Sequence, residues 1–160
     1  GVRLPSISAA SAKAVTAVIA VALTLRGDRS EPDIVYRRLS DEQTRRPWRI
    51  TGIFASDPTA IWVSPATHIE EAPARSPWIS ATRDVSRLVT IYNASPNPIV
   101  RIDLRRVRSS GMLVIDFSQP KMLKLLRGRR AATFMAIADS EVLIFLHVPP
   151  HAILGEYVPD

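Results

Sequence analysis

The sequence predicts an α+β fold, in which several short β-strands pack with a few short helices. Short runs rich in β-branched residues recur along the chain and are separated by prolines, 13 of them in 160 residues, as expected for strands joined by turns. Strands do not alternate regularly with long amphipathic helices, as they would in a parallel βαβ fold. An apolar share of 46% and a charged share of 22% are typical of one globular domain with a core.

The most apolar segment, ISAASAKAVTAVIAVALTL, predicts a helix over residues 5–25. Its uninterrupted apolar part at 14–25 is shorter than the roughly 20 residues that cross a bilayer, so we expect a packed helix and no stable membrane insertion. The sequence RGDRSEPD at 26–33 predicts a polar linker. The chain therefore divides into an apolar helical arm with its linker, residues 1–30, and a folded domain, residues 31–160.

The first half of this domain is expected to contain strands and helices in turn. Residues 34–39 (IVYRRL) read as a strand, and Ser40 is a capping residue that predicts a short helix behind it. The proline-broken stretch that follows offers only the triplet IWV at 61–63 as a strand. A further strand is expected at 76–82 (SPWISAT), and residues 84–93 place their apolar side chains at helical spacing.

The second half is expected to consist mainly of strands. Apolar and charged residues alternate over 99–107, which indicates a half-buried strand. A short basic helix at 121–126 should lead into a loop at 127–136. The remaining strands are predicted at 112–117, 141–148 and 152–158, the last two separated by a turn at Pro149 and Pro150.

The charges are distributed unevenly along the chain. The sequence carries 21 Lys and Arg against 15 Asp and Glu, a net charge of +6. Residues 99–130 hold nine basic side chains against Asp103 and Asp116, a local excess of seven. Such a block can attract a polyanion, such as nucleic acid or the diphosphate of a cofactor. The alternative interpretation is the solvated face of an exposed strand.

Several common kinds of active site are excluded by the residues present. The chain has no cysteine, which excludes thiolate nucleophiles and cysteine-bound zinc. Its three histidines, His68, His147 and His151, lack the spacing of metal ligands, so we expect no metal. Neither a glycine-flanked serine elbow nor a glycine-rich phosphate loop occurs. A bound nucleotide would therefore be held by side chains.

Three short motifs remain, and they occur in a definite order. Tyr36 and Arg37 lie on the first predicted strand, the run WISAT at 78–82 lies on the next, and Asp139 and Glu141 open a late strand. Taken singly, each motif has an ordinary structural interpretation, because a strand-end arginine and acids at a strand start usually face solvent. Only their order points to a function.

In this order the motifs resemble those of the ADP-ribosyltransferase toxins, in particular the group of the enterotoxin and cholera toxin catalytic chains, pertussis toxin and the pierisin-like enzymes. That family has an arginine after a tyrosine on the first strand, an aromatic-x-Ser-Thr-Ser motif on the second, and Glu-x-Glu or Gln-x-Glu on a later one. Arg37, Ser80 and Glu141 occupy these three places. Two positions depart from the pattern, since the second motif reads Ser-Ala-Thr and the first acid is Asp139.

The resemblance covers residues 34–158 and implies a split, mainly antiparallel β-sheet core of the ADP-ribosyltransferase type, with residues 31–160 as the catalytic domain. It also implies NAD+ as the co-substrate and no metal. Glu141 would stabilise the positive charge that develops on the ribose when nicotinamide leaves. Ser80 would orient Glu141, and Asp139 would position or deprotonate the acceptor.

The same resemblance implies a set of residues that bind NAD+. Arg37 suits the diphosphate because a guanidinium offers permanently charged, bidentate donors. His68 stands where many of these toxins carry a histidine near the cofactor. The expected cofactor-binding residues are Tyr36, Arg37, His68, Ser80 and Thr82.

The expected acceptor-binding residues are Phe134, Arg129 and Arg130, in the predicted loop before Asp139. In the resembling toxins this loop helps to select the acceptor, and an aromatic side chain there can contact it. Packing of Phe134 onto the core is the structural alternative.

We therefore expect a mono-ADP-ribosyltransferase toxin domain, secreted or injected by a bacterium and active in the cytoplasm of the target cell. Its acceptor would be a macromolecule, with a protein favoured over RNA or DNA, and a cognate immunity protein would be a second partner. The alternative is a non-enzymatic, basic nucleic-acid-binding module with an inactive transferase-like fold. Phe117 is the only aromatic residue between 99 and 130, which argues against binding of single strands.

Overall fold

A computed structural model describes residues 31–90, 95–126 and 128–160 of the chain. The predicted helical arm at 5–25 lies outside these residues, as does most of the linker. The described part has an α+β architecture built on a mainly antiparallel six-stranded sheet of order β5-β6-β3-β1-β4-β8. Its strands are β1 (Ile34–Arg38), β3 (Trp78–Thr82), β4 (Ile99–Asp103), β5 (Val114–Asp116), β6 (Glu141–Phe145) and β8 (Ile153–Glu156). A separate pair is formed by β2 (Ile53–Phe54) and β7 (His147–Val148).

Short helices connect the strands. The α-helices are α2 (Asp41–Thr44), α3 (Trp48–Thr51), α4 (Pro65–Glu71), α5 (Val85–Thr90), α6 (Leu104–Ser109) and α7 (Arg130–Ala138). Two 3₁₀ helices, η1 (Pro120–Leu126) and η2 (Pro150–Ala152), complete the set. In the part of the chain described, no helix is long and apolar enough to cross a bilayer.

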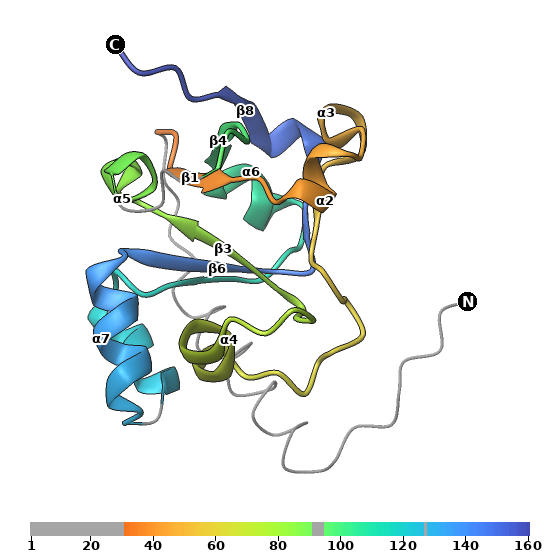
Figure 1. Ribbon diagram of the computed structural model, residues 1–160. Helices are drawn as coiled ribbons and strands as arrows, with labels where there is room; N and C mark the ends of the chain where they lie inside the picture. The colour runs from red at the N-terminus through yellow and green to blue at the C-terminus, as the bar shows by residue number, and fades with distance from the viewer. Residues whose placement is uncertain (1–30, 91–94, 127) are drawn as a thin grey trace.

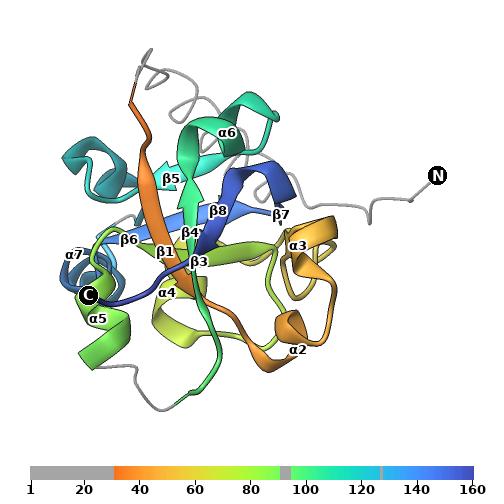
Figure 2. The same cartoon turned by 90° about the horizontal axis from the view of Figure 1, so that it is seen from above.

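The six-stranded sheet divides between β1 and β3. These two strands share one residue pair, Tyr36 with Thr82, whereas β1 and β4 pair over the whole of β1. The sheet therefore separates into a β1-β4-β8 half and a β5-β6-β3 half, which appear as two layers (Figure 1). Viewed from above, β1 and β4 cross β3 and β6 at a steep angle (Figure 2). From Trp78 to Ala81 the edge of β3 that faces β1 is not paired with it.

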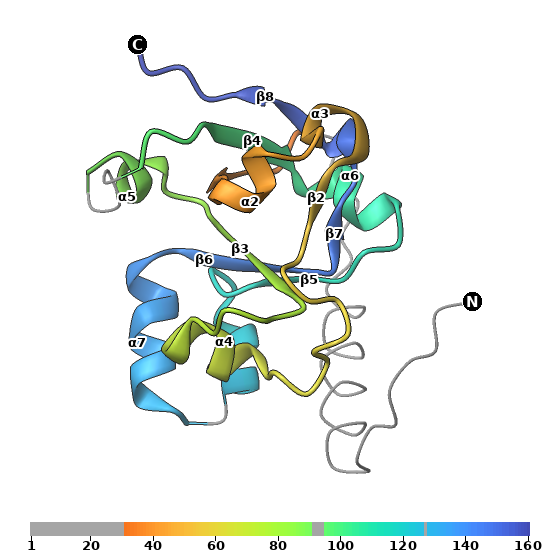
Figure 3. The same ribbon diagram turned by 45° about the vertical axis from the view of Figure 1, so that its right-hand side comes forward.

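Two hydrophobic clusters lie on opposite faces of the β5-β6-β3 half. Along β6, Val142 and Ile144 belong to the first cluster, which also takes up Val35 of β1. Leu143 points the other way, into the second cluster, beneath helices α4 and α7. This alternation explains why β6 is buried along most of its length. Helices α4 and α7 cover this outer face (Figure 3).

An ion-pair network ties the ends of the two halves together. Arg83, which follows β3, contacts Asp33 before β1 at 2.7 Å and Asp116 at the end of β5 at 2.6 Å. Arg108 of α6 adds a contact of 3.3 Å to Asp33. Both carboxylates are buried. Burial alone would lower the pKa of Arg83, but the hydrogen bonds that Arg83 donates to Asp116 and Asp33, together with their negative charges, raise it above its usual value.

The structure confirms most of the predicted elements. Strands form within 34–39, 76–82, 112–117, 141–148 and 152–158, and helices form after Ser40 and within 84–93 and 121–126. Ser40 caps α2 as expected, since its hydroxyl accepts a hydrogen bond from the Gln43 main chain at 3.2 Å.

Three of the predictions are wrong. The triplet at 61–63 forms a turn, in which the Val63 N–H bonds to the Ala60 carbonyl, and the strand in this stretch is β2 instead, because Ile53 and Phe54 pair with β7. The strand predicted at 99–107 ends at Asp103, whose side chain caps helix α6 through the Arg105 N–H. The predicted loop at 127–136 contains most of helix α7, which buries Ala132 and Ala136 one turn apart.

Candidate active site

A cleft of about 570 Å³ opens where β1 and β3 diverge. Its walls come from β1, α2, β2, α4, β3, α5, α7 and the start of β6. All of the predicted catalytic and cofactor-binding residues line it: Tyr36, Arg37, His68, Ser80, Thr82, Asp139 and Glu141. Residues far apart in the sequence therefore meet in one cavity.

The strand register explains how Ser80, Thr82 and Glu141 come together. Thr82 pairs directly with Glu141 across β3 and β6, so the two side chains lie on the same face of the sheet. Ser80 lies two residues before Thr82 and shares that face. Leu143, two residues after Glu141, packs beneath α4 and α7. The face that carries these polar side chains is thus the one covered by these helices.

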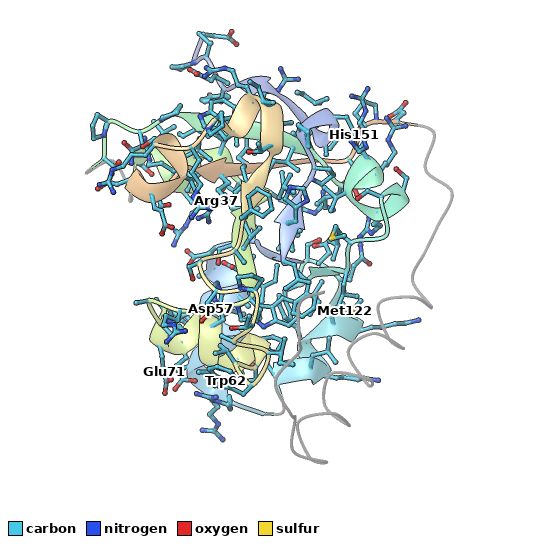
Figure 4. All side chains as sticks on the ribbon, turned by 90° about the vertical axis from the view of Figure 1, so that its right-hand side faces the viewer. Arg37, Asp57, Trp62, Glu71, Met122 and His151 are labelled. Atoms are coloured by element: carbon cyan, nitrogen blue, oxygen red, sulfur yellow. The ribbon has the colours of Figure 1, made fainter. Side chains whose placement is uncertain are left out.

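Arg37 enters the cleft from β1. Its Nη1 donates to the Ser80 main-chain oxygen at 2.8 Å, on the edge of β3 that β1 leaves uncovered. Its Nε and Nη2 both donate to Oε1 of Gln43 at 3.1 Å. Burial lowers the pKa of Arg37 to about 10, although the nearby Glu141 opposes this effect. At neutral pH the side chain is therefore a half-buried cation, positioned beneath helix α2 (Figure 4).

His68 of helix α4 connects two serine hydroxyls. Its Nδ1 lies 2.7 Å from Oγ of Ser76, and its Nε2 lies 2.8 Å from Oγ of Ser80. The Trp78 main-chain N–H donates to Ser76 Oγ at 3.2 Å. Burial, assisted by the positive charge of Arg37, lowers the pKa of His68 to about 4. The ring is therefore neutral at physiological pH.

Glu141 is a buried carboxylate at the base of the cleft. Its side chain is almost fully buried, and among the described residues its Oε1 has no hydrogen-bond partner. Burial raises its pKa to about 7; the negative charge of Asp139 acts in the same direction, while a hydrogen bond from Ser80 and the charge of Arg37 lower it. A buried acceptor atom without a partner is energetically costly and is characteristic of a site that awaits a ligand.

Asp139 lies beside Glu141 but has a different environment. Its Oδ1 forms an ion pair of 2.8 Å with Nη2 of Arg87 on helix α5. Its main-chain oxygen accepts a hydrogen bond of 2.6 Å from the Thr82 hydroxyl. Thr82 therefore lines the cleft while its hydroxyl holds the end of α7. Ser140, between the two acids, has a φ of 47°, a strained conformation for a residue other than glycine.

Tyr36 lies at the point where the two halves of the sheet meet. It lines the cleft and packs edge-to-face against Tyr157, with ring centroids 5.7 Å apart. The C-terminal segment after β8 thereby supports one wall of the cleft.

The predicted acceptor-binding residues lie on helix α7 or at its start, outside the cleft lining. Phe134 is 75% exposed, so it does not pack onto the core, and its neighbour Met135 reaches the cleft. Arg129 forms an ion pair of 2.9 Å with Glu70 of α4. Arg130 is exposed at the first position of the helix. That Phe134, Arg129 and Arg130 contact an acceptor stays a prediction.

The basic stretch 99–130 does not present all of its charge to solvent. Arg105 and Arg106 contact Asp103 at 3.0 and 3.8 Å, and Arg108 contacts Asp33. Lys121 and Lys124 are exposed on η1, at a different place in the fold. Internal ion pairs thus account for much of the local excess.

Sequence reasoning missed three residues that shape the site, namely Gln43, Ser76 and Arg87. Gln43 could have been found, because Ser40-x-x-Gln43 is a capping-box pattern that places the glutamine amide at the helix start. No sequence signal marks Ser76 or Arg87, whose partners lie 8 and 52 residues away. The described residues contain no cluster of potential metal ligands.

Comparison with known proteins gives limited information. No family model matches the chain, and no curated protein matches it significantly. A solved structure named EcPltA is similar over 78% of this chain and 74% of that one, with a TM-score of 0.54 and 17% sequence identity. This similarity concerns the fold alone.

Proposed function

We propose that this chain is a mono-ADP-ribosyltransferase that cleaves NAD+ and transfers ADP-ribose to a macromolecular acceptor. The observation that carries the proposal is the unpartnered, buried Oε1 of Glu141 in the same cleft as the Arg37 cation. An NAD+ molecule needs one group for its diphosphate and another for the charge that develops on its ribose. The cleft offers the positive charge of Arg37 for the diphosphate and the carboxylate of Glu141 for the ribose.

The chemistry assigned to Glu141 follows from its position. When the bond between nicotinamide and ribose breaks, its electron pair leaves with nicotinamide and the ribose becomes cationic. A fixed carboxylate in a site shielded from water stabilises that cation strongly. The acceptor nucleophile then bonds to the same ribose carbon, and its proton passes to Asp139, which lines the same cleft. The Ser80 hydroxyl, whose hydrogen bonding lowers the pKa of Glu141, would orient the carboxylate.

The role of Arg37 follows from its donors and its charge. A guanidinium can bind two phosphate oxygens at once, without a glycine-rich loop. Arg37 keeps N–H groups beyond the three that Gln43 and Ser80 use. The division of the sheet at Tyr36 and Thr82 fits the split core expected of the ADP-ribosyltransferase toxins, and supports the same assignment.

The biological setting of the proposal rests on the same resemblance. The domain would act as a secreted or injected effector in the cytoplasm of a target cell, with a protein as the favoured acceptor and a cognate immunity protein as a partner. Phe134 and the neighbouring arginines Arg129 and Arg130 would face the acceptor, since helix α7 ends at Ala138 and its C-cap residue Asp139 lines the cleft.

The second candidate, a nucleic-acid-binding module without activity, has less support. It would need a basic surface free to meet phosphates, whereas Arg105, Arg106 and Arg108 engage Asp103 and Asp33. It also leaves the buried Glu141 carboxylate unexplained.

The decisive experiment measures nicotinamide release from NAD+ and follows labelled ADP-ribose into the protein and RNA fractions of a cell lysate. We expect release and labelling with the wild type, and at least roughly a hundredfold less with Glu141→Gln. Glu71→Gln, the same substitution at an exposed position of α4 outside the cleft, is the matched control and should retain activity. No release from the wild type, with salt-sensitive RNA binding that Glu141→Gln leaves intact, would support the binding module instead.

A further inference from the structure

Gln43 holds Arg37 by an arrangement that the helix alone does not require. Its Oε1 accepts three hydrogen bonds, from Nε and Nη2 of Arg37 at 3.1 Å and from the Ser40 main chain at 3.0 Å. Its Nε2 donates to the Phe54 main-chain oxygen at 3.3 Å. A flipped amide would turn donors toward donors, so this orientation is fixed by its partners.

These bonds determine which part of the guanidinium is left for a ligand. A guanidinium has five N–H groups. Gln43 uses the one on Nε and one on Nη2, and the Ser80 carbonyl uses one on Nη1. One N–H on each terminal nitrogen therefore remains without a partner among the described residues. Both remaining N–H groups can donate to oxygens of a phosphate.

The charge of the partner is as important as its geometry. The side chains and carbonyls that bind Arg37 are neutral, and Glu141 acts on it only through space. A carboxylate at position 43 could accept the same three hydrogen bonds, and Glu is as good as Gln in a capping box. It would, however, neutralise the cation that an anionic ligand needs. Glu and Gln at position 43 would cap the helix equally well, but only Gln leaves Arg37 with the net positive charge that an anionic ligand needs.

We propose that Gln43 is a positioning residue for Arg37, whose neutral amide fixes the guanidinium and leaves its charge and two donors for the diphosphate of NAD+. This inference rests on the proposed function, because the diphosphate belongs to NAD+. It adds a residue on helix α2 that acts on the ligand only through Arg37.

The test compares Gln43→Glu with Gln43→Ala and with Thr44→Glu, which adds the same charge on the same helix outside the cleft lining. The readouts are the thermal midpoint, the dissociation constant for ADP-ribose measured by calorimetry, and KM and kcat for nicotinamide release. Gln43→Glu keeps the cap but loses the Nε2 hydrogen bond to Phe54, so we expect it to lower the thermal midpoint less than Gln43→Ala does, while ADP-ribose binds about tenfold more weakly. KM should rise more than kcat falls. Thr44→Glu should change the dissociation constant less than about twofold.

Gln43→Ala separates orientation from charge. It should weaken ADP-ribose binding and also lower the thermal midpoint, because the capping box is lost. Wild-type affinity in Gln43→Glu, with the wild type itself active, would show that Gln43 merely caps the helix and would overturn the inference alone. A wild type that neither binds ADP-ribose nor releases nicotinamide would overturn the proposed function, and this inference with it.

Discussion

The Ser80 hydroxyl oxygen lies 2.8 Å from Nε2 of His68, and the opposite ring nitrogen lies 2.7 Å from the Ser76 hydroxyl. Since Ser76 Oγ already accepts from the Trp78 main chain, its own hydrogen can point to Nδ1. Nε2 then carries the ring proton and donates to Ser80, whose hydrogen is left for Glu141. The opposite tautomer would direct the Ser80 hydrogen to the ring and away from the carboxylate.

We therefore predict that His68 is a neutral Nε2–H tautomer between about pH 6 and 8. The ¹⁵N chemical shifts of the two ring nitrogens in labelled protein measure this directly. A protonated Nδ1 would contradict the prediction. His68→Ala should reduce nicotinamide release by about tenfold, because the Ser80 hydroxyl would lose the donor that orients it. His68→Gln, whose amide can donate to Ser80, should recover part of this loss.

The second prediction concerns stability and pH. The pKa of His68 is lowered to about 4. Between pH 6.5 and 4 the unfolded chain therefore binds a proton at His68 that the native state does not bind. The free energy of unfolding consequently falls as the pH falls through this range. The pKa of Glu141 is raised to about 7. Between pH 4.5 and 7 the native state therefore keeps a proton on Glu141 that the unfolded chain has lost. The free energy of unfolding consequently falls as the pH rises through this range. Each effect is on the order of 3 kcal/mol.

Between about pH 4.5 and 6.5 these two effects oppose each other, so the free energy of unfolding of the wild type should vary little there. His68→Gln leaves the Glu141 effect alone, and its stability should decline from pH 5 to 7. Glu141→Gln leaves the His68 effect alone, and its stability should increase from pH 4 to 6.5. Urea unfolding at a series of pH values measures all three curves. Parallel curves for the three proteins would show that these groups do not titrate as their environment indicates.

The third prediction concerns activity and pH. If Glu141 must be ionised, kcat/KM for NAD+ should rise through about pH 7 and then level off. Asp139 contributes to raising the pKa of Glu141 by its negative charge. Asp139→Asn should therefore move the rising limb to lower pH, whatever it does to transfer. A limb that stays in place in this variant would assign it to another group.

Much of the site could be predicted because it depends on local pattern. Strands β3 and β6 are short runs with clear boundaries, so Ser80 and Glu141 could each be placed on a strand from the sequence. The pairing of Thr82 with Glu141 then brings the two onto one face. Arg37 could be placed on the first strand in the same way. The contact of Arg37 with Gln43 could be predicted only by also recognising the capping-box pattern at the start of helix α2.

The errors arose where tertiary context overrides a local pattern. The alternation over 99–107 is real, but the strand stops at Asp103, which pairs with Ile34 at the start of β1. Beyond that point none of the described strands lies opposite the chain, which forms α6 instead. Helix α7 was not predicted because Gly128 before it suggested a loop, although Ala132 and Ala136 have the spacing of a buried helix face. Leu146, with a φ of 71°, ends β6 and turns the chain into β7.

The fourth prediction concerns the ion-pair network between the two halves of the sheet. Arg83→Met should lower the free energy of unfolding by about 3–5 kcal/mol, because it leaves the buried Asp116 without its cation. Arg75→Ala is the control, since Arg75 is 76% exposed in its pair with Asp57 and should contribute less than about 1 kcal/mol. Urea unfolding measures both. Equal small losses in the two variants would mean that the network adds little to stability.

The last prediction concerns the acceptor. Phe134 and Ile137 are 75% and 59% exposed on α7, one turn apart, beside the helix end that carries Asp139 into the cleft. If a macromolecular acceptor docks there, truncating an exposed aromatic anchor should weaken its capture by about tenfold. Phe134→Ala should therefore lower transfer of ADP-ribose to the acceptor while nicotinamide release in its absence and the thermal midpoint stay unchanged. Trp62→Ala removes an aromatic that is 60% exposed and does not line the cleft, and it should spare both reactions. Equal transfer by Phe134→Ala and the wild type would place the acceptor on a different surface.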